Sequence, residues 1–331
     1  MKAAFIKQTG SPDVIEVGEL PLPIVGVHDA LIRVKAVSVN PIDTYIRSGA
    51  VAMDLPMPYI IGCDAAGVVE AIGEHVEHVQ VGDRIWLTNQ GMLGRQGTFA
   101  EQIYVDQRWC YPLPDDVEFE TGAACALVGV TAHLGLFRDA RLQSDETVLV
   151  IGGTGGVGAM VVQMAKAAGA RVIATAGSAE KCQRAESLGA DVVIDYTKES
   201  IADAVRQAAP EGVDVFWETR REPDFDVAID LLAPRGRMVL MAGRDARPVF
   251  PVGPFYVKEC SIHGFVMFKA SPSEMRTAAD EINLWHQRGE LQANIARRFA
   301  LDEAAEAHRL QEDATVGDSG ALGGKIVLNV P

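Results

Sequence analysis

The fold class is decided by one stretch of sequence, Val148-Leu149-Val150-Ile151-Gly152-Gly153-Thr154-Gly155-Gly156-Val157-Gly158. Its first four residues predict a buried strand, and an apolar stripe over 157–168 predicts a helix. Glycines 153, 155 and 158 form the pattern GxGxxG between them, which in this position is typical of a dinucleotide-binding loop. Gly153 permits a tight turn, Gly155 lets backbone approach a pyrophosphate, and Gly158 lets helix and strand pack closely.

The helix that follows offers unpaired N–H groups and the positive end of its dipole to a phosphate. The alternative is a plain tight turn without a ligand. We take as candidate cofactor-binding residues the whole loop: Gly153, Thr154, Gly155, Gly156, Val157 and Gly158.

Short apolar runs continue to alternate with helical stretches beyond this loop. We expect strands at residues 148–151, 171–176, 192–194, 213–217, 237–241 and 261–266, with helices over 157–168 and 179–188 among them. Such alternation produces βαβ units and therefore an α/β, doubly wound parallel sheet of the Rossmann type. The predicted nucleotide-binding domain covers residues 126–266.

The sequence on either side of this domain has a different pattern of apolar residues. Residues 31–37 alternate apolar and polar side chains, and frequent Gly and Pro predict many short strands in a partly open barrel or small sandwich. After residue 266, one face of an amphipathic helix carries Met275, Ala278, Ile282 and Trp285. A last strand at 325–328 is expected to return to the N-terminal part of the chain, so residues 1–125 and 267–331 together form a β-rich domain.

Composition narrows the functional classes. The chain has 331 residues, and at roughly 150 residues per domain this length suggests two domains. Its net charge of −15 argues against a nucleic-acid binder or an anchor on anionic membrane, because both need basic faces. Residues 1–8 are too short and polar for a signal peptide and predict an opening strand. Five scattered cysteines without a CxxC pair fit reduced thiols in the cytoplasm and supply no structural zinc cluster.

The end of the second predicted strand bears on the choice of nicotinamide cofactor. Proteins that bind NAD usually carry Asp or Glu there to hold the ribose 2′-hydroxyl. Here Gly177 and Ser178 take that place, with Lys181 close by, which favours NADPH because serine and lysine can hold a 2′-phosphate. The alternative is that Ser178 caps a helix and Lys181 is a solvated surface residue.

Several further segments carry a resemblance to a known family. They are residues 39–49 (VNPIDTYIRSG), 61–69 (IGCDAAGVV), 81–84 (VGDR), 129–132 (GVTA), the glycine loop and 320–327 (GALGGKIV). The chain resembles the zinc-independent medium-chain dehydrogenases/reductases, and among them the NADPH:quinone oxidoreductases related to ζ-crystallin. The resemblance implies a GroES-like barrel beside the Rossmann domain, reduction of a small-molecule quinone by NADPH without a metal, and a homodimer formed through the sixth-strand edges.

The resemblance also implies further site residues. By analogy, Asn40 and Tyr45 border the substrate pocket and are the candidate catalytic residues, although Asn40 could simply cap a helix and Tyr45 could be a core aromatic. Tyr196 joins Ser178 and Lys181 around the 2′-phosphate. The residues expected near the rest of the cofactor are Thr131, Ala242, Gly243, Arg244, Phe265, Val266, Met267 and Lys325.

Zinc-dependent relatives place ligands where this chain has Asn40, Cys63 and Leu127, so a single thiol remains and no metal site is expected. Cys63 is therefore interpreted as a small buried residue, with a redox-sensitive thiol as the alternative. The turn after the fourth strand departs from the family, because Arg220 and Arg221 stand where relatives have a small glycine-containing turn. We expect one of these arginines to fold over the cofactor.

The cofactor carries the hydride in such chemistry, so no metal and no His–Asp pair are required. The seven histidines, His28, His75 and His78 among them, are expected at the surface. Two other readings stay open: an NADPH-dependent ene reductase that acts on enals, enones or 2-enoyl thioesters, and a non-catalytic NADPH-binding protein. The sequence names neither the acceptor nor the number of electrons transferred per step.

Overall fold

The structure, a computed structural model, describes residues 1–22, 24–317 and 322–331. Gly320 and Ala321 of the C-terminal motif lie outside the described residues. The chain divides into two compact units, one formed by Met1–Leu127 with Ser271–Pro331 and the other by Val128–Ala270. The sequence pattern places the corresponding boundaries at 125/126 and 266/267.

The unit Val128–Ala270 is built on a six-stranded sheet in the order β11-β10-β9-β12-β13-β14, in which all neighbouring strands are parallel. Its strands are β9 (Thr147–Val150), β10 (Arg171–Ala176), β11 (Val192–Asp195), β12 (Val213–Glu218), β13 (Leu232–Leu240) and β14 (Ser261–Gly264). The predicted doubly wound sheet is confirmed. β13 begins at Leu232, before the start predicted at residue 237. The apolar pattern did not reveal this start because Pro234 and Gly236 interrupt it, and the register of the strand is irregular there.

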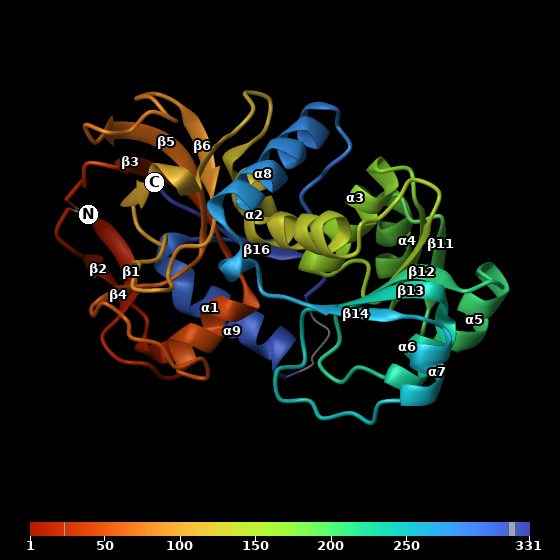
Figure 1. Ribbon diagram of the computed structural model, residues 1–331. Helices are drawn as coiled ribbons and strands as arrows, with labels where there is room; N and C mark the ends of the chain where they lie inside the picture. The colour runs from red at the N-terminus through yellow and green to blue at the C-terminus, as the bar shows by residue number, and fades with distance from the viewer. Residues whose placement is uncertain (23, 318–321) are drawn as a thin grey trace. The chain divides into compact units, whose positions relative to one another are not determined.

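Helices cover both faces of this sheet (Figure 1). They are α3 (Gly156–Ala167), α4 (Ala179–Ser187), α5 (Ile201–Ala208), α6 (Phe225–Leu231) and α7 (Val252–Val257). The last three pack on a buried core of strand residues that includes Leu149, Ile173 and Phe216, while α3 and α4 lie against β9, β10 and β11 from the opposite side. Because helices shield the strands on each face, continuous apolar runs are stable in the sheet.

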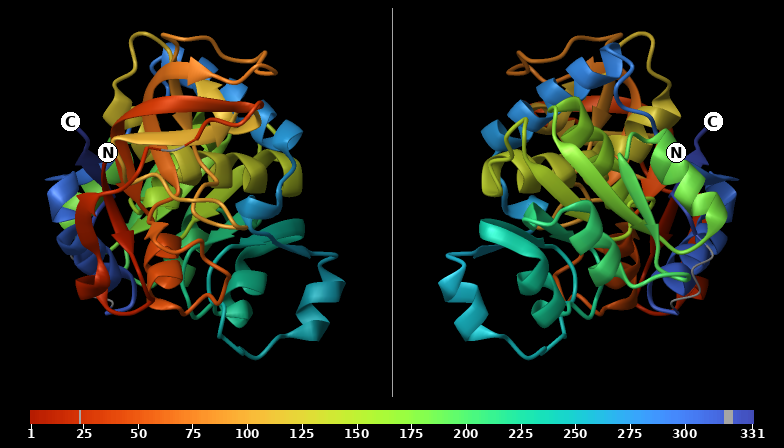
Figure 2. Two further views of the ribbon diagram at one scale, coloured as in Figure 1. Left: turned by 90° about the vertical axis from the view of Figure 1, so that its left-hand side faces the viewer. Right: turned by 90° about the vertical axis from the view of Figure 1, so that its right-hand side faces the viewer.

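The other unit is rich in short strands. A three-stranded sheet has the order β2-β1-β4, and a seven-stranded sheet has the order β15-β16-β3-β5-β6-β8, with β7 paired to β3. The strands are β1 (Lys2–Ile6), β2 (Glu16–Glu19), β3 (Asp29–Val39), β4 (Tyr59–Ile60), β5 (Asp64–Ile72), β6 (Arg84–Leu87), β7 (Gln102–Asp106), β8 (Cys110–Pro112), β15 (Ile295–Ala300) and β16 (Lys325–Asn329). The opening strand is confirmed, and so is the return of the C-terminal strand, since β16 pairs with β3. Both termini therefore lie in this unit (Figure 2).

The α-helices that begin in the described part of this unit are α1 (Pro41–Ser48), α2 (Phe119–His133), α8 (Pro272–Gln287) and α9 (Ala304–Thr315). α2 continues into the other unit beyond Leu127. The predicted face of α8 is confirmed, because Met275, Ala278, Ile282 and Trp285 are all buried. The helical segment Phe119–Asp139 is apolar and long enough to cross a membrane, but 83% of its apolar window is buried inside the protein, as in a core helix.

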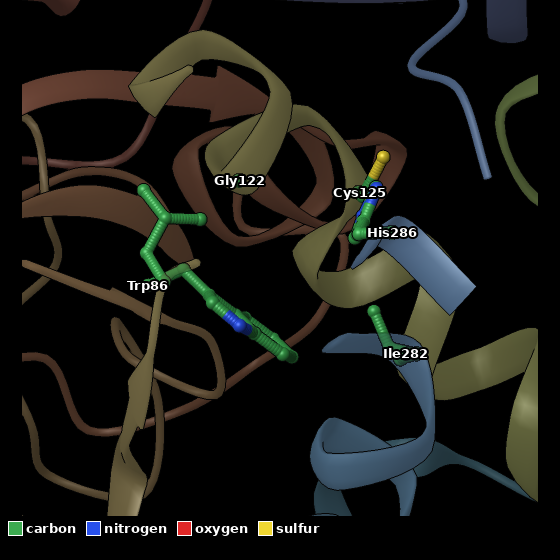
Figure 3. A pocket seen from close by; sticks show the side chains of 6 residues that line it. Trp86, Gly122, Cys125, Ile282 and His286 are labelled. Carbon is green, nitrogen blue, oxygen red and sulfur yellow. The ribbon is translucent and has the colours of Figure 1, made fainter. Parts of the chain in front are cut away.

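Side chains from α2 and α8 meet β6 in the core of the first unit (Figure 3). Cys125 on α2 lies beside Ile282 and His286 on α8, and the indole of Trp86 donates to the Asn283 Oδ1 atom at 2.9 Å. The apolar walls leave no room for a water-sized molecule. This region is a packed core and offers no space to a substrate.

The expectation that the histidines lie at the surface is wrong for three of them. His133, His286 and His308 are buried. His308 on α9 is fully buried against the Phe99 ring, and neither ring nitrogen has a hydrogen-bond partner among the described residues. Burial and the nearby Arg47 guanidinium lower the pKa of His308 to about 3, so the folded protein keeps this ring neutral.

This burial predicts acid sensitivity with a defined origin. The unfolded chain protonates His308 near its ordinary pKa of about 6.5, whereas the folded chain does not do so until about pH 3, so stability falls as the pH drops between these values. We expect His308→Gln to lose about 1 kcal/mol less stability than the wild type between pH 6 and pH 5. Urea unfolding at both pH values measures the difference, with His78→Gln, an exposed histidine, as the control. Equal losses in wild type and H308Q would contradict the assignment.

Candidate functional site

The glycine turn joins β9 to α3 through a close approach of backbone to backbone. Gly152 has φ +75°, and the Gly153 N–H donates to the Thr175 carbonyl at 3.0 Å. A Cβ atom at Gly158 would lie 2.1 Å from the Gly152 carbonyl oxygen, and one at Gly153 would lie 2.7 Å from the Ala174 Cβ atom. The left-handed residue of the turn is thus Gly152, whereas Gly153 is required by its contact with β10.

The middle of this turn has the room that a cofactor phosphate needs. A Cβ at Gly155 would meet only the Gly152 carbonyl oxygen, at an ordinary 3.5 Å, so this stretch of backbone is open. Gly155 caps α3, whose first turn therefore begins at the open point. Open backbone with unpaired helical N–H groups fits a pyrophosphate. The half-buried side chain of Val157 and the buried Thr154 flank the open backbone.

A second group of predicted residues comes together where β10 and β11 end. A Cβ at Gly177 would lie 2.2 Å from the Tyr196 hydroxyl, so the tyrosine side chain lies directly on the glycine. Ser178 caps α4, and its hydroxyl accepts from the Lys181 N–H at 3.2 Å. The Asp195 carboxylate is already engaged by Thr197 at 2.6 Å and by Lys198 at 2.8 Å. β10 ends without an acidic residue, which fits a cofactor that carries a 2′-phosphate.

The loops that follow β12 and β13 touch each other. A Cβ at Gly243, which has φ +80°, would lie 2.5 Å from the Arg221 carbonyl oxygen. The neighbouring Ala242 and Arg244 are exposed. Among the residues predicted near β14, Val266 is exposed and Phe265 is half-buried beside the Arg138 guanidinium. Met267 and Thr131 are buried.

In the first unit, Asn40 lies in a buried polar cluster. Its Nδ2 group donates to Asp64 Oδ2 at 2.8 Å, and its Oδ1 atom accepts from the Lys325 ammonium. Lys325 also donates to the Val39 carbonyl at 2.8 Å. Asp64 accepts further hydrogen bonds from Ser38 at 2.9 Å and Thr88 at 2.7 Å. Both ends of the Asn40 amide are thus engaged inside the protein, and this residue is fully buried.

The same cluster contains ionisable groups that burial perturbs. Burial lowers the pKa of Lys325 and raises the pKa of Asp64, and each of the two charges opposes the shift of the other. Burial also raises the pKa of Asp43 to about 7. The Asp43 carboxyl accepts the Asn40 N–H at 2.7 Å, which secures the start of α1. Cys63 is fully buried beside this carboxyl, and burial raises the pKa of its thiol well above the ordinary value.

Tyr45 on α1 is half-buried, and its backbone carbonyl accepts from Val51 at 3.1 Å. Its part in a substrate pocket stays a prediction. Sequence reasoning missed Asp64 and Glu218, two fully buried carboxylates. The signal in both cases was an acid inside an otherwise apolar run, since such a residue needs partners in the interior.

Two family models match the chain. Residues 26–115 match the alcohol dehydrogenase GroES-like domain, and residues 156–283 match the domain described as zinc-binding dehydrogenase. A quinone oxidoreductase from Lama guanicoe is 32% identical over 330 residues, which cover 99% of this chain and 97% of the relative. The chain belongs to the quinone oxidoreductase family.

Solved structures agree with this membership. A quinone oxidoreductase of Escherichia coli, solved in complex with NADPH, aligns with a TM-score of 0.84 at 26% identity and covers 99% of this chain and 100% of its own. An NAD-dependent alcohol dehydrogenase aligns with a TM-score of 0.89 at 30% identity, with complete coverage of both chains. The GroES-like barrel and the Rossmann-type sheet are therefore confirmed in this quinone oxidoreductase family member.

No group of three or more His, Cys, Asp or Glu side chains in residues 1–22, 24–317 and 322–331 is arranged to hold a metal ion. In the first unit, the buried ammonium of Lys325 is bound by Asn40 and Val39. The Lys325 ammonium donates to the Val39 carbonyl and to the Asn40 Oδ1 atom, so both oxygen atoms have their hydrogen-bond partner within the protein.

This arrangement predicts a large stability loss when the ammonium is removed. In Lys325→Met, the buried Asp64 carboxylate and the Asn40 Oδ1 atom lose their cation, which we expect to destabilise the protein by about 3–5 kcal/mol. Urea unfolding measures the change, and Lys269→Met, at an exposed lysine, should stay within about 0.5 kcal/mol of the wild type. A K325M protein as stable as the wild type would show that Lys325 is dispensable to the cluster.

Proposed function

We propose that the protein is an NADPH:quinone oxidoreductase that works without zinc. The observation that carries the proposal is the end of β10, where Tyr196 lies against Gly177, Ser178 caps α4 through the Lys181 N–H, and no carboxylate is present on β10 to hold a ribose hydroxyl. Relatives named quinone oxidoreductase, among them one solved with NADPH, match the chain along its length. Cofactor phosphates would be held by the open backbone at Gly155 and the N-terminus of α3.

The bound nicotinamide supplies the hydride, and one proton from water completes the reduction of a quinone to a hydroquinone. The chain has to bind both partners and keep bulk water away. We assign Asn40 to positioning, because both ends of its amide are bound, one by Asp64 and the other by Lys325, and it stands at the start of α1. We assign Tyr45, which lies in the same helix α1, to the quinone pocket. Thr131, Phe265 and Val266 are assigned to the nicotinamide.

A turnover assay tests this function. The purified protein should oxidise NADPH rapidly with 1,4-benzoquinone and slowly with trans-2-hexenal, and NADH should be a poor donor in both reactions. Faster turnover of the enal would make the protein an ene reductase and would assign the proton donor to Tyr45. NADPH binding without turnover of either acceptor would make it a non-catalytic binding protein.

We further propose a cytoplasmic homodimer. All five cysteines are free thiols, which suits a reducing compartment. β14 forms an edge of the six-stranded sheet, and exposed apolar side chains of Val252, Tyr256 and Val257 lie on α7 just before it in the chain. A second copy could continue the sheet there, and a solution mass equal to one 35.5 kDa chain would contradict the dimer.

The assignment of the 2′-phosphate site predicts a switch in cofactor preference. Ser178→Asp keeps a good helix cap but places a carboxylate where the 2′-phosphate would bind, so we expect kcat/KM for NADPH to fall about tenfold or more while that for NADH holds or rises. The matched control is Ser200→Asp, the same change at the cap of α5, which should leave both values unchanged. An unaltered NADPH/NADH ratio in S178D would remove Ser178 from the cofactor site.

A further inference from the structure

In the sheet of the second unit, Val128–Ala270, the order of the strands reverses between β9 and β12. From β9 the chain runs outward through β10 and β11 on one side and then returns to build β12, β13 and β14 on the other. In open α/β sheets, ligands bind beyond the carboxyl ends of the strands at such a reversal. The glycine turn follows β9 on one side of this point, and Glu218, Thr219 and Arg220 follow from β12 on the other.

Contacts between the two segments show that they lie side by side. The Ile151 N–H donates to the Trp217 carbonyl at 3.0 Å, and the Thr219 hydroxyl donates to the Ile151 carbonyl at 2.7 Å. A Cβ on Gly152 would lie 2.8 Å from the Thr219 hydroxyl oxygen. Arg220 directly follows Thr219, whose side chain contacts the glycine turn.

A buried carboxylate holds the Arg220 guanidinium. The Nη2 group donates to Glu218 Oε2 at 2.7 Å, and Nε donates to Oε1 at 3.0 Å. The Arg220 N–H also donates to Glu218 Oε1, at 2.8 Å. The Glu218 side chain is fully buried, whereas 40% of the Arg220 side chain is exposed. One edge of the guanidinium is thus fixed by Glu218 while part of the side chain faces out from the sheet.

Stability alone is a weak reason for this pair. Burying a carboxylate costs several kcal/mol of hydration, and apolar residues of similar volume usually stabilise a core as well or better. A guanidinium held in a fixed orientation is, in contrast, well suited to a phosphate, because its planar fork loses little freedom when it binds. Arg221 and Arg244 follow the same strand ends, but Glu222, Asp224 and Asp245 stand there too, so it is the fixed guanidinium of Arg220 that favours a phosphate here and not a local excess of positive charge.

We propose that Arg220 is a clamp for the pyrophosphate of the dinucleotide, opposite the glycine turn, and that Glu218 is the positioning residue that keeps its guanidinium in place. This inference rests on the proposed function, because it takes NADPH as the ligand. The glycine turn would hold the phosphates by backbone N–H groups from the β9 side, and Arg220 would donate to their oxygens from the β12 side.

Binding titrations test the clamp independently of turnover. Because Arg220→Gln alone would leave Glu218 buried without a cation, the main variant is the neutral pair Glu218→Gln with Arg220→Gln. We expect its NADPH dissociation constant, measured by cofactor fluorescence, to rise about 10- to 100-fold, the loss of one hydrogen-bonded contact to a charged group. Glu218→Gln alone keeps the guanidinium but frees it, so its affinity should fall between the two. The matched control replaces another ion pair of this unit, Arg206→Gln with Asp230→Asn, and should bind as the wild type does.

A second probe separates the clamp from a general disturbance of the fold. Adenosine 2′-monophosphate carries the 2′-phosphate but no pyrophosphate, so its affinity should be equal in the wild type and in the double variant. An unchanged NADPH affinity in the double variant would overturn the clamp, and so would equal losses for NADPH and adenosine 2′-monophosphate. A wild-type protein that binds neither compound would overturn the proposed function itself, which makes the two failures distinguishable.

Discussion

The contact between Gly158 and the Gly152 carbonyl is the constraint on which the nucleotide-binding unit depends. Only a residue without a side chain lets the first turn of α3 come so near the end of β9, since a Cβ would lie 2.1 Å from that oxygen. The approach aims the helix axis at the open backbone of Gly155. Gly152 also lies against the segment that follows β12, because the Thr219 hydroxyl donates to the Ile151 carbonyl one residue earlier. A larger residue at 158 would separate the helix from the strand and disrupt the proposed phosphate site together with the packing.

The packing of the first unit depends instead on a buried charge, the ammonium of Lys325. Lys325, Asn40 and Asp64 come from three segments far apart in the sequence, which β16, β3 and β5 bring together as neighbouring strands. The ammonium is bound on one side of the Asn40 amide and the carboxylate on the other, so the three groups fix the start of α1 and the ends of two strands at once. An interior network of this kind is favourable only when its members are all satisfied. Ser38 and Thr88 complete it by donating to the remaining lone pairs of Asp64.

The sequence was sufficient for the features that depend on local pattern. The period of the apolar runs predicts the parallel sheet and the buried face of α8, and the spacing of glycines predicts the turn after β9. Features that depend on pairing across long distances were not predictable in the same way. The partners of Lys325 lie almost 300 positions away in the chain, and His308 is polar by type but buried by the packing of α9 against Phe99. The start of β13 was not predicted because Pro234 and Gly236 interrupt the apolar pattern of the strand.

The way in which Asn40 is bound also bears on the kind of chemistry that this unit can support. An amide whose carbonyl accepts from Lys325 and whose NH2 group donates to Asp64 has little capacity left for a substrate, and the residue is fully buried. A reaction that required a side-chain acid or a metal at this position would be poorly served by it. Hydride transfer from a bound nicotinamide makes no such demand, since the reactive atoms belong to the cofactor and the acceptor. The chain can therefore use the cluster around Asn40 to stabilise its own fold, and the residues that we propose to recognise the cofactor lie at the carboxyl ends of β9, β10 and β12.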